Sequence, residues 1–295
     1  MISLSGILNI YKPLGPTSFA VVARVRKLTG EPKVGHGGTL DPLASGVLPV
    51  FLGKATRLQD YLMQYPKTYR ASVALGVSTD SYDAEGAVTA HGDVSAITQE
   101  VIQDALRAFR GVIKQTPPEY SALKHNGQPL YKLAREGRSV EVQSRLTTIY
   151  RLEMLEFTPS ALELEVECSK GTYIRSLAHE LGQALGCGAH VSGLVRISYG
   201  PFDINQALSL ESLEKAALSG DLSCLVQPMD SVLARWPKVV LLDAQVEMVC
   251  YGEALELQMP ADFEHLRAYD TKGCFIAMLE YDSEAGVWHP KKVFR

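Results

Sequence analysis

The stretch "ALELEVECSKGTYIRSLAHELG", residues 161–182, joins two different periodicities. Its first eight residues alternate, with Leu162, Leu164 and Val166 on one face and glutamates on the other, which predicts a half-buried antiparallel strand. After the turn "SKGT", leucines recur at every fourth position and predict an amphipathic helix. Strands and helices mixed in this way, without a βαβ repeat, favour an α+β fold over a doubly wound one.

The sequence on the N-terminal side continues this mixture. Strands are predicted at residues 4–13, 47–53 and 68–76, which are rich in β-branched and aromatic residues and end at turn residues. Helices are predicted over residues 19–28 and 98–111 from their apolar spacing. We therefore expect a mixed, mainly antiparallel sheet flanked by helices.

The C-terminal part has a different texture. From Trp236 onward, short strand-like runs alternate with turn residues, and Pro237 interrupts the preceding pattern. A chain of 295 residues is longer than a typical single domain. The sequence thus predicts a large domain over residues 1–235 and a small β-barrel-like module over residues 236–295.

Composition excludes several classes of protein. No apolar run is long enough to span a membrane, and no charged-then-apolar leader follows Met1, so the expected location is the cytoplasm and no membrane partner is expected. The five cysteines are an odd set without a CxxC pair, which argues against disulfides and a thiolate zinc site. No metal is expected.

The net charge of −4 hides an uneven distribution. Residues 1–70 contain nine Lys or Arg and three acids, and residues 111–151 contain seven and three. The remainder of the chain is strongly acidic. Such asymmetry is what a surface facing a polyanion would show, although a basic run can equally be a solvated face.

A second stretch, "GHGGTLDPLASG" at residues 35–46, carries the chemistry. Its glycines at 35, 37 and 38 allow positive φ and close backbone approach, and Pro42 restricts Asp41 to extended conformations. A phosphate loop is rejected because the Walker lysine and hydroxyl and the GxGxxG spacing are missing. Spacing alone leaves an Asp-Pro turn as the plainer interpretation.

Four ordered segments decide between these interpretations. They are "NIYKPLGPTS" at 9–18, "GHGGTLDPLASGVL" at 35–48, "PPEYSALKHNGQPLYKLAREG" at 117–137 and "SKGTYIRSLAHELG" at 169–182. Together they resemble the TruB-type tRNA pseudouridine synthases in their bacterial, stand-alone form. The resemblance implies the pseudouridine synthase fold and, for residues 236–295, a PUA-like domain.

The activity implied is the isomerisation of uridine to pseudouridine at position 55 of tRNA, in the T-psi-C loop. The reaction needs no cofactor, but it needs a carboxylate that attacks either ribose C1′ or uracil C6. The resemblance assigns that role to Asp41, with Arg175 beside it to keep it ionised and Tyr69 stacked on the extruded uracil. It also places His36, Tyr173 and Leu194 in the substrate site, and Lys12 and Pro13 beneath the catalytic loop as structural support.

The basic segments are interpreted as contacts to the T-arm stem-loop. Residues 121–145 resemble the family's mobile insertion that closes over this arm, and "GLVRISYGPF" adds one further cation. The predicted RNA contacts are Lys124, His125, Lys132, Arg135, Arg138, Arg145 and Arg196. A monomer that acts without guide RNA is expected.

Three alternatives remain at this stage. A tRNA-binding or folding chaperone with incidental catalysis would share the basic segments. A glycosidase would need two carboxylates, and residues 32–59 contain only one acid. A guide-RNA-dependent relative would lack the segment at 117–137.

Overall fold

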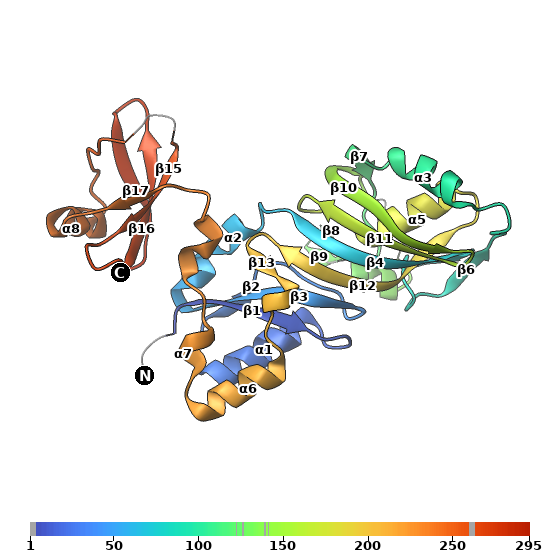
Figure 1. The fold of residues 1–295 in the computed structure, drawn as a ribbon, viewed down its shortest axis with the longest axis horizontal. Helices are drawn as coiled ribbons and strands as arrows, with labels where there is room; N and C mark the ends of the chain where they lie inside the picture. The colour runs from blue at the N-terminus through green and yellow to red at the C-terminus, as the bar shows by residue number, and fades with distance from the viewer. Residues whose placement is uncertain (1–3, 122, 126, 139, 141, 260–262) are drawn as a thin grey trace.

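The computed structural model describes residues 4–121, 123–125, 127–138, 140, 142–259 and 263–295. One nine-stranded sheet runs through the large domain, in the order β1-β3-β12-β4-β11-β10-β7 (Figure 1). The short strands β2 and β13 pair with β3 and β12. The bounds are β1 (Gly6–Lys12), β2 (Val34–His36), β3 (Ala44–Leu52), β4 (Lys67–Leu75), β7 (Gly111–Gln115), β10 (Arg145–Thr158), β11 (Ala161–Cys168), β12 (Ala189–Tyr199) and β13 (Phe202–Asp203).

The mixed sheet with flanking helices is confirmed. Helices α1 (Ser18–Thr29) and α6 (Leu210–Ser219) pack on the β1–β3 end, whereas α3 (Gln99–Arg107) and α5 (Ile174–Ala184) cover the β4–β11 end. Thr17 caps α1 by accepting a hydrogen bond from the Ala20 amide, and Gly30 ends the helix at φ 67°. Smaller elements are β5 (Val77–Thr79), β6 (Val88–His91), α2 (Gln59–Leu62) and α7 (Leu222–Leu225).

Strand β12 connects the two halves of the sheet. It pairs in parallel with β3 through Leu194 and Ala44, and antiparallel with β4 through Arg196 and Tyr69. The same strand therefore lies beside the segment that follows Asp41 and beside the strand that carries Tyr69. The active-site candidates lie at this junction.

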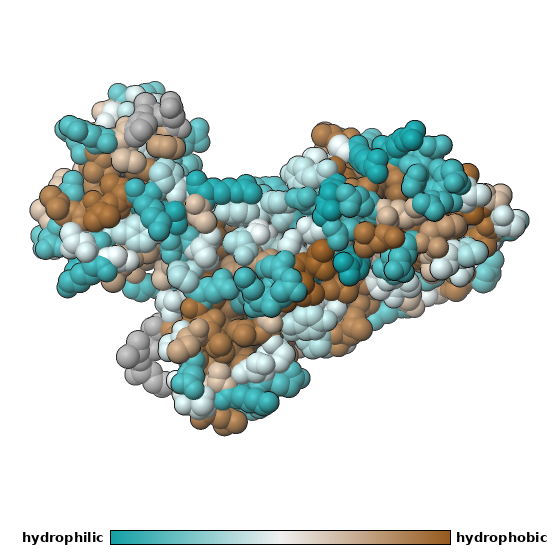
Figure 2. All heavy atoms as spheres, viewed as in Figure 1, coloured by the Kyte–Doolittle hydropathy of each residue, from teal (hydrophilic) through white to brown (hydrophobic). Residues whose placement is uncertain are grey.

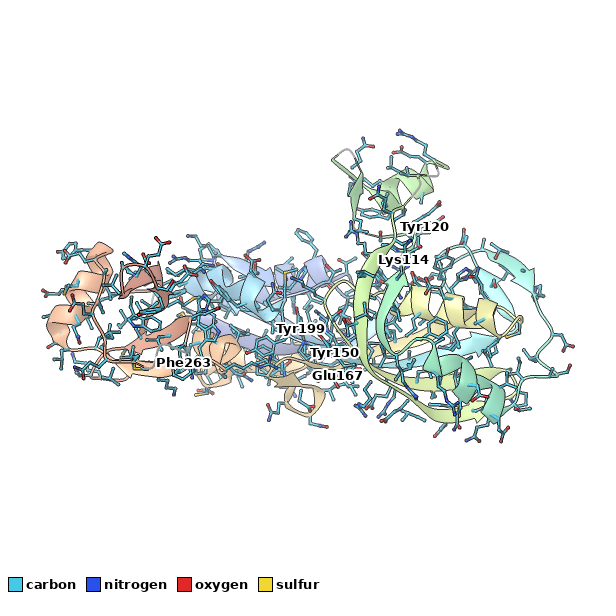
Figure 3. The ribbon with its side chains drawn as sticks, turned by 90° about the horizontal axis from the view of Figure 1, so that it is seen from above. Lys114, Tyr120, Tyr150, Glu167, Tyr199 and Phe263 are labelled. Carbon is cyan, nitrogen blue, oxygen red and sulfur yellow. The ribbon has the colours of Figure 1, made fainter. Side chains whose placement is uncertain are left out.

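The insertion projects from the body of the large domain. It contains β8 (Lys124–His125), β9 (Gln128–Pro129) and α4 (Leu130–Arg135). Figure 3 shows it standing away from the sheet, with Tyr120 at its base. Leu130 and Leu133 are buried.

The C-terminal part is an open sheet with one helix. Its strands β14 (Lys238–Val240), β15 (His265–Tyr269), β16 (Phe275–Asp282) and β17 (Val287–Val293) pair in sequence order. Within the described residues β14 and β17 form the two edges, so the predicted closed barrel is not seen. The strand-only prediction is also wrong here, because α8 (Asp243–Tyr251) is a helix. The amide of Leu242 donates to the Gln245 side chain before α8, and Gly252 ends the helix at φ 83°.

Specific contacts attach this C-terminal part to the large domain. Arg267 on β15 forms a buried ion pair of 3.2 Å with Asp230, and Arg57 donates to the Val293 carbonyl. The hydropathy surface in Figure 2 shows hydrophilic side chains over most of the visible face, with hydrophobic ones in separate patches. No helix among the described residues is both long and apolar enough to cross a membrane.

Candidate active site

Asp41 lies on the loop between β2 and β3, and this loop is tied to several elements. Ser18, at the start of α1, both donates to the Leu40 carbonyl and accepts from the Leu40 amide, at 2.9 and 2.8 Å. Tyr199 at the end of β12 donates to the Gly37 carbonyl at 2.7 Å. Such anchoring fixes the loop backbone, and hence the position from which the carboxylate projects.

The glycines of the loop serve packing within the protein. Gly35, Gly37 and Gly38 all have negative φ, so of the two properties that these glycines allow, positive φ and close backbone approach, the loop does not use the first. A Cβ on Gly35 would lie 2.1 Å from the Gln59 side chain, and one on Gly37 would lie 2.5 Å from Leu62. These glycines allow the loop to pack closely against the segment that contains α2.

Lys12 and Pro13 lie beneath the far end of the loop. The Lys12 ammonium is fully buried and donates to the carbonyl oxygens of Ala44 and Pro13, at 2.6 and 2.9 Å. Burial lowers the pKa of Lys12 to about 8, while the charge of Asp41 acts in the opposite direction. Lys12 thus holds the start of β3, directly after the loop that carries Asp41.

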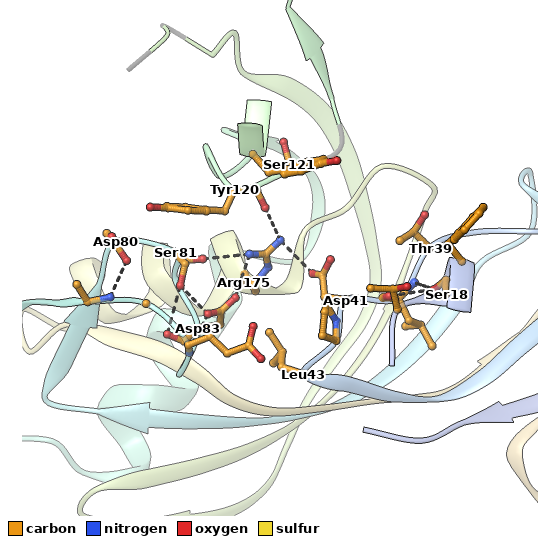
Figure 4. Close-up of a pocket in the computed structure, with 18 of the residues that line it drawn as sticks. Ser18, Thr39, Asp41, Leu43, Asp80, Ser81, Asp83, Tyr120, Ser121 and Arg175 are labelled. Atoms are coloured by element: carbon orange, nitrogen blue, oxygen red, sulfur yellow. Dashed lines mark hydrogen bonds and ion pairs between the residues drawn. The ribbon is translucent and has the colours of Figure 1, made fainter. Parts of the chain in front are cut away.

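Arg175 connects the loop that carries Asp41 with a second loop. Its Nη2 lies 3.0 Å from Asp41 Oδ2, and its Nη1 lies 3.0 Å from Asp83 Oδ2 (Figure 4). The same guanidinium donates to the carbonyls of Ser81 and Tyr120. Only 7% of the Arg175 side chain is exposed, against 41% for Asp41. A buried cation therefore stabilises an accessible carboxylate, which suits a nucleophile.

The other predicted substrate residues converge on one side of Asp41. A cavity of about 310 Å³ is lined by Asp41, Tyr69, Tyr173, Arg175 and Leu194. It lies at the small end of the range for ligand pockets, about 300–1,000 Å³. Burial raises the pKa of Tyr69 and of Tyr173, so both phenols are neutral at ordinary pH.

A second and larger cavity opens on the other side of Asp41. It has a volume of about 790 Å³ and includes Ser18, Phe19, His36, Asp83 and Tyr131 in its lining. His36 is half-buried, and its Nδ1 accepts a hydrogen bond from the Gly38 amide at 3.2 Å. Burial lowers the pKa of His36, which favours the neutral ring. His36 and Tyr69 therefore line different cavities.

Arg196 requires a correction. The sequence predicted an RNA contact, but the residue is 1% exposed. Its guanidinium donates to the carbonyls of Val47 and Gly38, at 2.7 and 3.1 Å. One of these carbonyls lies on β3 and the other on the loop that carries Asp41, so Arg196 joins this loop to the sheet.

The predicted RNA contacts on the insertion are placed only in part. Lys132, Arg138 and Arg145 are exposed, and Arg138 lies 3.6 Å from Glu136. The side chains of Lys124, His125 and Arg135 lie outside the described residues. Residues 122, 126, 139 and 141, which also fall within the segment predicted to be mobile, lie outside the described residues as well.

The sequence analysis missed several members of the site. Asp83 lies on the turn between β5 and β6, where no local motif marks it as a partner of Arg175. Tyr120 belongs to the quoted segment 117–137, but its carbonyl is the interacting group. Lys67 lines the smaller cavity two residues before Tyr69. Strand alternation from Tyr69 would have placed Lys67 on the same face.

Comparison with known proteins identifies the family. The model of the TruB family pseudouridylate synthase N-terminal domain matches residues 26–174, and that of the tRNA pseudouridylate synthase B C-terminal domain matches residues 175–234. The tRNA pseudouridine synthase B of Dehalococcoides mccartyi is 45% identical over 99% of this chain and 97% of its own. That of Pseudomonas aeruginosa is 43% identical over the same shares.

A solved structure agrees with this result. A chain from an H/ACA ribonucleoprotein bound to a substrate RNA containing 2′-deoxyuridine superposes with a TM-score of 0.74 and 29% identity, over 98% of this chain and 85% of the other. The chain belongs to the TruB family of pseudouridylate synthases. It is an enzyme with the pseudouridine synthase fold.

Proposed function

We propose that this enzyme converts uridine 55 in the T-psi-C loop of tRNA to pseudouridine, with Asp41 as the nucleophile. The observation that carries the proposal is the 3.0 Å ion pair between Arg175 and Asp41 at the wall of a cavity that also contains Tyr69. The names of the relatives, which are tRNA pseudouridine synthases, support the substrate class. Transfer RNA as substrate also favours a cytoplasmic location.

The smaller cavity suits an extruded uracil. Tyr69 and Tyr173 offer aromatic faces, and Leu194 offers an apolar contact, which together replace the stacking that the base loses on flipping. Asp41 then attacks ribose C1′ or uracil C6, and the C1′–N1 bond is broken. C5 is joined to C1′, the bond to Asp41 is broken, and C5 loses a proton while N1 gains one. Arg175 Nη2, 3.0 Å from Asp41 Oδ2, supplies the positive charge beside the attacking carboxylate.

The insertion and the C-terminal part are proposed as RNA-binding elements. Residues 121–145 would close over the T-arm stem, with Lys132 and Arg145 on phosphates, and this segment would become ordered on binding RNA. The module of residues 236–295, interpreted as a PUA-like domain, would contact the acceptor side. Phosphate contacts of this kind make affinity fall with salt. A monomer is expected, without a guide RNA.

The test is incubation of the pure protein with an unmodified tRNA transcript, without any other RNA, and mapping of pseudouridine along the transcript. We expect a single modified position in the T loop. Pseudouridine at several unrelated positions, or none, would contradict the proposal. Release of free uracil would instead indicate a glycosidase.

Asp41→Asn is the matched variant, because it preserves shape and removes the charge. We expect pseudouridine formation to fall by at least about 10⁴-fold, as for loss of other nucleophiles. RNA affinity and thermal unfolding should stay near wild type. If Asp41→Asn retained activity, Asp41 would not be the nucleophile. If the wild-type protein refolded tRNA without modifying it, a chaperone would be indicated.

A further inference from the structure

The smaller cavity contains a lysine for which the proposed chemistry has so far given no role. Lys67 is the first residue of β4, and the strand's alternation places it on the same face as Tyr69. Both residues line the cavity, together with Asp41 and Arg175. Lys67 is therefore within the site and not on the outer face of the sheet.

The Lys67 ammonium is held without an anionic partner. Its Nζ lies 4.3 Å from the centroid of the Tyr199 ring. Among the described residues, no carboxylate or hydrogen-bond acceptor is in contact with it. Tyr199 is itself fixed, because its hydroxyl donates to the Gly37 carbonyl. The aromatic face thus holds the cation in the cavity and leaves its N–H donors available.

The charged and titratable groups around Lys67 come from three elements. Besides burial, Arg196 on β12 and Lys170 in the turn after β11 disfavour its charge, and Cys168 at the end of β11 favours it. Burial is the largest effect, and it lowers the pKa of Lys67 to about 8. The ammonium form is still the main one near neutral pH. Because Lys67 is largely buried, water competes poorly with a bound substrate for the hydrogen-bond donors of its ammonium group.

The reaction creates a need for such a donor. If Asp41 attacks C1′, the electron pair of the C1′–N1 bond passes to the uracil. If Asp41 attacks C6, a pair from the C5=C6 bond moves onto the C4 carbonyl oxygen. In either case negative charge develops on the carbonyl oxygens of the ring. Donors aimed at developing charge are a major source of catalysis.

We propose that Lys67 is a catalytic residue whose ammonium group donates a hydrogen bond to a uracil carbonyl oxygen while negative charge develops there. Lys67 ends the cycle with the proton it began with, since the proton lost from C5 is balanced by the one gained at N1. The inference rests on the proposed function and adds a residue to the same site.

The test compares Lys67→Met and Lys67→Arg in single-turnover pseudouridine formation with enzyme in excess of a tRNA transcript. We expect Lys67→Met to slow the chemical step by about 10²–10³-fold, as for loss of an oxyanion donor. Its Kd for tRNA should be unchanged. Lys215→Met, on an exposed position of α6, is the matched control and should react at the wild-type rate.

The pH dependence adds a readout that a structural role would not change. Wild-type kcat/KM should decline as pH rises through about 8, when Lys67 loses its proton. The Lys67→Arg variant keeps its charge far above this range, so its decline should disappear. An unchanged decline in Lys67→Arg would contradict the proposal, because buried Lys12 has a similarly lowered pKa.

Other outcomes separate the competing explanations. A Lys67→Met variant that reacts at the wild-type rate but binds tRNA more weakly, with a smaller salt slope, would show a phosphate contact and overturn the proposal. If Lys67→Met does not fold by circular dichroism, the pH profile of Lys67→Arg decides. Absence of pseudouridine with wild-type protein would instead refute the proposed function.

Discussion

The two cavities on either side of Asp41 share this carboxylate and Arg175, but they differ in size and in charge. The larger one, about 790 Å³, is lined by four acidic residues and one arginine among the described residues. The smaller one, about 310 Å³, is lined by two lysines and two arginines, with Asp41 as its acid. Volume alone would select the larger cavity as the substrate site. The charges of the lining residues select the smaller cavity. The uracil ring becomes negative during the reaction, and the RNA backbone is already negative.

The shared arginine gives the sharpest way to test this difference. Arg175→Lys retains one positive charge, but a compact ammonium cannot reach Asp41, Asp83 and the two carbonyls together. We expect single-turnover activity to fall by about 10²–10³-fold. Tm should also drop, because Asp83 is 3% exposed and would lose its cation.

The control for Arg175→Lys is Arg151→Lys on the outer face of the sheet, where Arg151 pairs with Glu153. Its rate and Tm should stay close to wild type. A catalytically normal Arg175→Lys would mean that charge alone suffices. The simultaneous contacts of the guanidinium with Asp41 and Asp83 would then be unnecessary for catalysis.

Substitutions of Tyr69 test how the smaller cavity acts on the uracil base. Tyr69→Phe keeps the stacking face and removes the hydroxyl, whose pKa is raised by burial. We expect the chemical step to slow by about 10²-fold or more if this hydroxyl takes part in proton transfer. Tyr69→Leu should lose a further 1–3 kcal/mol, roughly, of base stacking. Equal rates for Phe and wild type would restrict Tyr69 to stacking.

Sequence reasoning located the smaller cavity better than the larger one. Tyr69, Tyr173 and Leu194, which the resemblance placed in the substrate site, line only the smaller cavity, whereas His36 lines only the larger one. The two-residue period of residues 161–168 correctly predicted β11. Contacts such as that between Asp83 and Arg175 join residues 92 positions apart, and no local pattern reports them. The partnership is created by the turn before β6, which only the tertiary fold brings to α5.

Arg196 shows an error that the sequence could have avoided. The resemblance of "GLVRISYGPF" to the family implied an RNA contact there, but strand alternation from Leu194 puts Arg196 on the same inward face. Helix α8 shows a different limit. Its nine residues are too few for a clear helical period, so the expected pattern of short strands and turns after Trp236 included no helix there.

The lowered pKa of Lys67 also predicts a dependence of stability on pH. The unfolded chain holds this proton up to its ordinary pKa of 10.5, whereas the folded protein releases it near 8. Between these values the unfolded state binds more protons, so the Lys67 contribution to stability rises with pH, by up to about 1.4 kcal/mol per pH unit. Below 8 the buried charge destabilises the fold to its full extent.

Urea unfolding of wild type and Lys67→Met at two pH values within this window measures the effect. The difference in unfolding free energy should change in favour of wild type as pH rises. Lys12 titrates in both proteins, so its contribution cancels. A difference that is constant with pH would mean that Lys67 keeps its ordinary pKa in the folded protein, so that burial does not destabilise its charge.

The smallest effect is expected from the acidic wall of the larger cavity. Glu85 is exposed, and it is the Glu85 backbone amide that donates to the Asp83 carboxylate, at 3.1 Å. Glu85→Gln preserves this bond, so the single-turnover rate should equal that of wild type. Removing one acid near the RNA should strengthen binding by about 0–1 kcal/mol at low salt, and less at high salt. Glu284→Gln, in an exposed turn of the C-terminal part, is the matched control. A large loss of rate in Glu85→Gln would place the reacting base in the larger cavity and reverse the assignment of the two.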